Sequence, residues 1–169
     1  MRRAFLKSVA ALAGASVLAG CGFKLRGSAQ LRFDSAYVDA PDTSLTRELR
    51  QTLTSHGKLA EKPELATLRI LLEGERRAKA ILSLTSAGKV REYRLELRVT
   101  LSVLDQAGKS VLNPGEVFVQ RDMTYDDQQA LAKELEETGL YRAMELDALR
   151  QILRRLDTIK LKKPADAAP

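Results

Sequence analysis

Residues 92–103 alternate between polar and apolar side chains without interruption, and this pattern constrains the fold more than any other part of the sequence. Successive side chains of a β-strand point to opposite faces of the sheet. The pattern therefore predicts a long antiparallel strand with one buried and one solvent-exposed face. The apolar positions are Tyr93, Leu95, Leu97, Val99, Leu101 and Val103, and the polar ones are Glu92, Arg94, Glu96, Arg98, Thr100 and Ser102.

Two further long strands are predicted beside this one, each joined to it by a short turn. Residues 68–84 place their apolar side chains mainly at even positions and lead into a turn at residues 86–89. A second turn at residues 106–109 precedes a third long strand, predicted from Val117 to Tyr125 with an irregular start at residues 113–115. Both turns contain glycine, as hairpin connections commonly do. Shorter strands are predicted at residues 23–26 and 35–38.

Leucine spacing predicts two amphipathic helices. In the first, at residues 44–56, leucines recur every four residues and Gly57 supplies a stop. The second begins at Asp126 or Asp127 and continues to about Leu156, with Gly139 as a possible bend. At 100° per residue, its apolar stripe consists of Leu131, Leu135, Leu146, Leu149, Leu153 and Leu156, with Ile152 beside it.

The predicted fold class follows from this order of elements. A strand, a helix, three long strands and a helix form an α+β two-layer sandwich. Its two helices pack on one face of a mostly antiparallel four-stranded sheet, because two amphipathic helices cover only one face. The other face of the sheet is then expected to remain polar.

The first twenty residues are typical of an export signal. A basic head precedes an uncharged run from Val9 to Leu18, which is shorter than the roughly 20 apolar residues of a membrane-spanning helix. The following Leu18-Ala19-Gly20-Cys21 matches the lipobox of bacterial lipoproteins. We expect cleavage between Gly20 and Cys21 and covalent lipid on Cys21. The basic head also resembles a twin-arginine signal, so the export route stays open between that pathway and general secretion.

This signal sets the expected domain organisation and location. Residues 1–20 are the cleaved peptide, residues 21–161 one lipidated α+β domain, and residues 162–169 a tail predicted to be disordered because it lacks large apolar side chains. In lipoproteins that this chain resembles, an Asp after the cysteine retains the protein in the inner membrane. Gly22 at that position implies an outer-membrane location, with the protein anchored by lipid on its periplasmic side.

Composition argues against nucleic-acid binding and against catalysis. The net charge of +6 falls to +3 without the signal, since that segment holds three cations and no acid. Proteins that bind nucleic acid usually carry a stronger basic field. His56 is the only histidine and Cys21 the only cysteine, so neither a Cys–His pair nor a histidine-based zinc site is available. We therefore expect no enzyme and no cofactor besides the covalent lipid.

Basic residues on both sides of the first hairpin suggest an anion-binding site. The predicted cluster consists of Arg76, Arg77, Lys79, Lys89, Arg91 and Arg94. Hydrogen bonds between such cations and phosphate groups are strong because both partners are charged. The alternative is ordinary solubilising charge, balanced by the neighbouring glutamates of both strands.

The segment Cys21-Gly22-Phe23-Lys24-Leu25-Arg26-Gly27 resembles the opening of the LptE family of lipopolysaccharide-assembly lipoproteins. Arg91-Glu92-Tyr93 and Ala130-Leu131-Ala132-Lys133 are similar to later parts of that family, so the resemblance covers residues 21–160. It implies an outer-membrane protein inside the lumen of the LptD β-barrel, where it assists barrel assembly and lipopolysaccharide delivery.

The resemblance also implies site residues. Lys133 matches a basic family position associated with lipopolysaccharide contact. A second such position falls near Ser86, where Lys89 or Arg91 takes its place. Two alternatives remain: a purely structural barrel-assembly chaperone that binds no lipopolysaccharide, and a generic periplasmic lipid-binding lipoprotein. A closed apolar cavity between sheet and helices would favour the generic lipid-binding lipoprotein.

Overall fold

The computed structural model describes residues 31–159. The predictions for the export signal, Cys21, the strand at residues 23–26 and the tail lie outside these residues. One sheet of four strands contains β1 (Ala36–Asp39), β2 (Leu68–Leu84), β3 (Val90–Asp105) and β4 (Ser110–Thr124), in that spatial order. Strand β1 pairs with β2 in parallel, whereas β2–β3 and β3–β4 are antiparallel.

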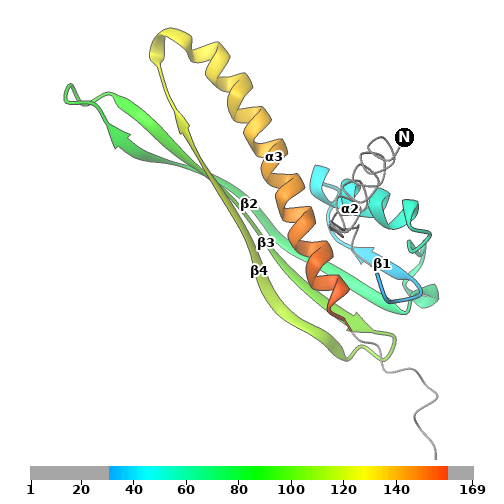
Figure 1. Cartoon of the computed structure of the whole chain (residues 1–169). Coiled ribbons are helices and arrows are strands. Elements are labelled where there is room, and N and C mark those ends of the chain that lie inside the picture. The colour runs from blue at the N-terminus through cyan, green and yellow to red at the C-terminus, as the bar shows by residue number, and fades with distance from the viewer. Residues whose placement is uncertain (1–30, 160–169) are drawn as a thin grey trace, which may run out of the picture. The chain divides into compact units, whose positions relative to one another are not determined.

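Two helices lie on one side of this sheet (Figure 1). They are α2 (Ser44–Ser55) and α3 (Ala130–Asp157), and the short 3₁₀ turns η1 (Pro63–Leu65) and η2 (Asp127–Gln129) precede β2 and α3. The predicted fold class, an α+β sandwich with a mostly antiparallel sheet, is confirmed. Because β1 is parallel to β2, the connection between them must cross over, and α2 forms part of that crossover.

The strict alternation in β3 corresponds to burial as predicted except at Ser102, a polar position that is also buried. Leu95, Leu97, Val99, Leu101 and Val103 are buried, and Tyr93 at the start of the series is half-buried. The apolar core lies between this face and the helices. Leu45, Leu49 and Leu53 of α2 are fully buried and contribute to it.

A bulge in β2 makes the predicted even-numbered apolar face wrong beyond Leu72. The pairing register with β3 shifts between Glu73 and Arg76, around Gly74, whose φ is +63°. An extra residue in one strand turns the following side chains to the opposite face, and glycine adopts positive φ without steric cost. After the bulge, Arg77 pairs with Leu97, so the odd-numbered residues face the helices.

Helix α3 is continuous through Gly139, but its predicted leucine stripe is wrong in the first half. The buried residues of α3 all lie from Tyr141 onward and include Met144, Ala148 and Ile152. Leu131 and Leu135 are largely exposed, and Leu146, a member of the predicted stripe in the second half, is exposed as well. The predicted start of the helix at Asp126 or Asp127 is closer to the structure. Asp126 caps the 3₁₀ turn η2, which leads into α3, by accepting a hydrogen bond from the backbone N–H of Gln128.

Candidate functional site

The candidate site lies at the end of the sheet that carries the β2–β3 turn. We call this region the hairpin end and define it as residues 81–93, residues 122–129 and the first turns of α3, residues 130–136. In Figure 1 the β2–β3 turn extends at the end of the sheet away from α2 and β1, and α3 begins at this end. Helix α2 packs at the other end, so it leaves the hairpin end uncovered.

Three predicted site residues meet at one short segment of this region. Lys89 Nζ lies 3.4 Å from Asp127 Oδ2, and the backbone oxygen of Arg91 accepts a hydrogen bond from Tyr125 N at 2.8 Å. Lys133 Nζ donates to Thr124 Oγ1 at 3.0 Å. Lys89, Arg91 and Lys133 therefore all contact the segment Thr124–Asp127, which joins β4 to α3. The structure brings these three residues together from two distant parts of the sequence.

The three cations differ in how available they are. Lys133 is mostly buried and also forms an ion pair with Glu136 at 2.8 Å. The side chain of Lys89 is 70% exposed, and its pairing with exposed Asp127 is of a kind that contributes little stability. Arg91 is exposed and has no ion pair within 4.0 Å among residues 31–159. Lys89 and Arg91 can therefore exchange solvent or a weak partner for a phosphate.

Arg76 and Arg77, by contrast, do not join this group, and their predicted proximity to Lys89 is wrong. Arg76 pairs with Arg98 in the strand register, whereas β2 ends with Leu84 opposite Val90. At about 3.3 Å per residue, Arg76 lies on the order of 25 Å along the strand from the turn. Arg76 and Arg77 also point to opposite faces of the sheet, as neighbouring strand residues do.

Arg77 forms internal contacts instead. It makes an ion pair with Glu145 of α3, and its guanidinium lies 5.1 Å from the ring centroid of Tyr141. Glu145 is a buried carboxylate that also accepts a hydrogen bond from Ser44 Oγ at 2.6 Å. Sequence reasoning missed Glu145, although a glutamate among the apolar positions of the second half of α3 is the signal that could have indicated it.

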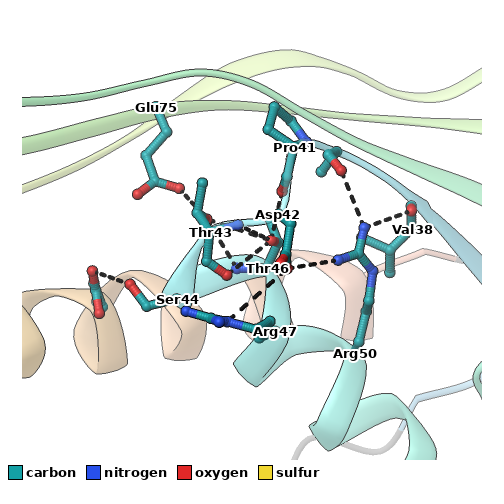
Figure 2. A network of polar contacts seen from close by, with 11 residues as sticks. Val38, Pro41, Asp42, Thr43, Ser44, Thr46, Arg47, Arg50 and Glu75 are labelled. Atoms are coloured by element: carbon teal, nitrogen blue, oxygen red, sulfur yellow. Dashed lines mark hydrogen bonds and ion pairs between the residues drawn. The ribbon is translucent and has the colours of Figure 1, made fainter.

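The start of α2 is held by a related polar network (Figure 2). Thr43 and Thr46 form a reciprocal capping box, and Thr43 Oγ1 donates to Glu75 Oε2 of β2 at 2.7 Å. Thr46 Oγ1 donates to the backbone oxygen of Pro41 at 2.7 Å. These contacts, together with those of Glu145, join α2, β2 and α3 near the middle of the long strands. The function of this network is structural.

Lys79, another member of the predicted cluster, is enclosed by its own partners. Its Nζ lies 2.5 Å from Glu137 Oε2 and 4.3 Å from the ring centroid of Tyr93. The hydrogen bond to Glu137 raises the pKa of Lys79 above its ordinary value, against the opposing effect of burial. The Tyr93 and Tyr125 rings meet edge to face at 5.2 Å. Lys79 therefore stabilises the attachment of α3 to the sheet.

The sheet face without helices carries a ladder of ion pairs between β3 and β4. Arg94 Nε donates to Asp122 Oδ1 at 2.9 Å, and this hydrogen bond lowers the pKa of Asp122 below its ordinary value. Arg98 pairs with Glu96 and Glu116, both at 3.1 Å. The predicted polar face is confirmed, and its charges are largely neutralised within the sheet.

Two hollows open to solvent lie away from the hairpin end. One lies beside η1 and the β3–β4 turn, and the other lies between Leu112 and the last turns of α3. Neither has the form of the closed apolar cavity expected for a generic lipid carrier. In the described residues 31–159, the helices do not include one with the length and apolar composition to span a membrane.

Comparisons with known proteins point to one family. The family model "LptE: Lipopolysaccharide-assembly" matches residues 32–156. The chain is 32% identical over 151 residues to the LPS-assembly lipoprotein LptE of Pectobacterium atrosepticum, covering 85% of this chain and 80% of that protein. It is 32% identical over 148 residues to the LPS-assembly lipoprotein LptE of Yersinia enterocolitica, covering 83% of this chain and 70% of that protein.

Two solved structures have a similar fold. The solution structure of an uncharacterized lipoprotein B from Nitrosomonas europaea aligns with a TM-score of 0.70 and 36% identity, covering 80% of this chain and 90% of that one. The crystal structure of the rare lipoprotein B from Shewanella oneidensis aligns with a TM-score of 0.64 and 25% identity, covering 72% of this chain and 92% of that one. The likeness therefore extends over nearly the full length of both lipoprotein structures.

Proposed function

This chain belongs to the LptE family of lipopolysaccharide-assembly proteins, and from that premise we propose that it is an outer-membrane lipoprotein serving an LptD-type β-barrel. In this proposal it occupies the barrel as a plug, assists barrel assembly and helps to deliver lipopolysaccharide to the outer leaflet. It acts by binding and needs neither a catalytic residue nor a cofactor. Its covalent lipid on Cys21 holds it at the inner surface of the outer membrane.

The ion-pair ladder supports the plug role. The interior of a membrane β-barrel is polar, so a protein within it must present polar surface. The helix-free face provides such a surface through Arg94, Arg98 and their partners on β3 and β4. Since these side chains are already paired, contact with a barrel wall leaves none of them without a charged partner.

The observation that carries the lipopolysaccharide role is the meeting of Lys89, Arg91 and Lys133 at the segment Thr124–Asp127. The side chains of Lys89 and Lys133 and the backbone of Arg91 contact this segment, and neighbouring cations suit an anion with more than one phosphate, since bonds between charged partners are strong. Lipid A, the membrane anchor of lipopolysaccharide, has this chemistry. We infer that its phosphates displace Asp127 and Glu136 from Lys89 and Lys133.

A purely structural role is the second candidate, and the same ion pairs favour it. Lys89 and Lys133 each have a carboxylate partner in the described structure, so an anion must compete with it. In that case the chain plugs the barrel and promotes its assembly without holding lipopolysaccharide. A generic periplasmic lipid-binding lipoprotein is the third candidate and has less support, because the two hollows are open to solvent.

The barrel partnership is tested by affinity purification of the lipidated full chain from detergent-solubilised outer membranes. We expect a large β-barrel to copurify in stoichiometric amount. Recovery of folded, lipidated bait without a barrel would overturn the plug proposal.

The lipopolysaccharide role is tested with the variant Lys89→Ala/Arg91→Ala/Lys133→Ala. We expect it to bind purified lipopolysaccharide more weakly than wild type, with the difference greatest at low salt because charge interactions are screened. The matched control is Arg32→Ala/Lys62→Ala/Lys109→Ala, which removes three exposed cations outside the hairpin end. Equal lipopolysaccharide binding by both variants, with normal barrel copurification, would establish the structural role instead.

A further inference from the structure

Helix α3 consists of two halves that are held in different ways. From Tyr141 onward its side chains enter the core, and Met144 and Ile152 are fully buried. Residues 130–140 bury no side chain, although they form about three helical turns. Most helical stability in proteins comes from the packing of an apolar face. The first half of α3 therefore depends on other contacts for its place on the sheet.

Those contacts are polar. In the described part of the chain, two side-chain hydrogen bonds join residues 130–138 to the sheet. Lys79 Nζ of β2 donates to Glu137 Oε2 at 2.5 Å, and Lys133 Nζ donates to Thr124 Oγ1 at 3.0 Å. The side chains of Lys79 and Glu137 are 34% and 23% exposed. Water can therefore replace either partner, and an ion pair of this kind contributes only modestly to stability.

Gly139 lies at the boundary between the two halves. An added Cβ at this position would meet no other group within 4 Å, and Gly139 is not among the glycines of positive φ. Neither close packing nor backbone conformation therefore requires a glycine here. Glycine weakens the interior of a helix relative to alanine. The helix is continuous through Gly139, so this position is a weak point without being a bend.

The length of the first half decides what happens when its polar contacts break. Isolated helices shorter than about 12–15 residues are marginal in water. Residues 130–138 form a shorter segment than that, so they unwind once they leave the sheet. From Tyr141 onward the buried side chains keep α3 folded. Loss of two polar contacts is therefore enough to open one half of the helix while the other half stays in place.

We propose that residues 130–138 form a latch segment that opens as one unit, by unwinding as far as Gly139, while the rest of α3 stays on the sheet. The ion pair between Lys79 and Glu137 holds the latch segment closed. Opening also separates Lys133 from Thr124, so the hairpin end can change its shape without loss of the core. This inference does not depend on the proposed function.

Hydrogen exchange of the backbone amides tests this proposal on the lipidated full chain in detergent. We expect the amides of residues 134–142 to exchange at one shared rate, at least about tenfold faster than those of residues 145–152. The boundary falls after Arg142, because an α-helical N–H bonds to the carbonyl oxygen four residues earlier. Simple fraying of a helix end instead gives rates that decrease gradually along the helix. Such a gradual decrease, or slow exchange throughout α3, would overturn the latch segment.

Two substitutions should change the opening in opposite directions, and circular dichroism verifies that each variant is folded. Glu137→Ala removes the ion pair with Lys79 and should raise the exchange rate of the latch segment about twofold to fivefold. Its matched control is Glu134→Ala, which changes an exposed glutamate of the same segment and alters helix propensity equally. Gly139→Ala strengthens the helix at the boundary and should lower the rate about fivefold. Equal rates in the two glutamate variants, or an unchanged rate in Gly139→Ala, would contradict the proposal.

Discussion

Glu145 of α3 and Arg77 of β2 form an ion pair across the interface between helix and sheet. The carboxylate is buried, whereas the side chain of Arg77 is 47% exposed. Arg77 faces α3 only because the bulge at Gly74 reverses the direction of the side chains that follow it. Ser44 at the start of α2 binds the same carboxylate oxygen. One glutamate therefore joins both helices to the long strand.

Removal of this carboxylate should destabilise the fold. We expect Glu145→Ala to lower the free energy of unfolding by about 1–3 kcal/mol, because hydrogen-bonding groups of Ser44 and Arg77 lose their partner. Urea denaturation provides the measurement. Glu134→Ala, which removes an exposed glutamate from the same helix, is the control and should change stability little. Similar losses in both variants would show that Glu145 has no special role.

The bulge in β2 should depend on Gly74. An added Cβ would meet nothing within 4 Å, so the cost of Gly74→Ala comes from its φ of +63°. We expect destabilisation of about 1–2 kcal/mol. Gly139→Ala is the opposite case. Gly139 lies within α3, and an added Cβ would meet no other group within 4 Å, so this substitution should stabilise the fold by up to about 1 kcal/mol. Thermal unfolding of both variants checks the signs, and stabilisation by Gly74→Ala would contradict the bulge.

Tyr141 should make stability depend on alkaline pH. Its hydroxyl donates to the backbone oxygen of Ala78 at 2.9 Å, and burial raises the pKa of Tyr141 above its ordinary value of 10.0. An acid with a raised folded-state pKa stabilises the fold below the unfolded-state pKa, and this contribution is lost as pH rises through the folded-state pKa. Tyr141→Phe should therefore show a shallower decline in unfolding free energy between about pH 9 and about pH 11. Parallel declines in the two proteins would refute this assignment.

Arg155 should protect the outer edge of β4. It donates to the backbone oxygens of Gly115 at 3.1 Å and Glu116 at 2.7 Å. Unpaired edge groups invite pairing with another chain. We expect Arg155→Ala to lower stability by about 1 kcal/mol and to increase self-association, measured by light scattering after size exclusion. Arg154→Ala, which changes an exposed neighbour, should remain like wild type. Equal self-association of both variants would argue against the edge role.

Sequence patterns correctly predicted the elements whose structure depends on neighbouring residues or on a regular repeat. The alternation of β3 gave the correct buried face, and the leucines of α2 with Gly57 gave that helix nearly to the residue. The same reasoning was wrong for the second half of β2. A bulge depends on pairing with a neighbouring strand, and the period of one strand does not reveal it.

The lipopolysaccharide-binding site stays a prediction. The resemblance pointed to Lys133 with Lys89 or Arg91, and in the structure the side chains of Lys89 and Lys133 and the backbone of Arg91 contact the segment Thr124–Asp127. Closeness in sequence wrongly added Arg76 and Arg77. In an extended strand, residues that are only a few positions apart in sequence lie far apart in space.

The sequence by itself determined the family, the order of the elements and the fold class, because motifs, turns and hydrophobic periods are properties of neighbouring residues. Only the tertiary structure decided which side chains those elements bury. Leu131 and Leu135 continue the leucine pattern of α3, yet they are exposed because α2 packs at the opposite end of the sheet. Burial depends on what lies opposite a side chain, and for α3 that partner comes from distant segments of the chain.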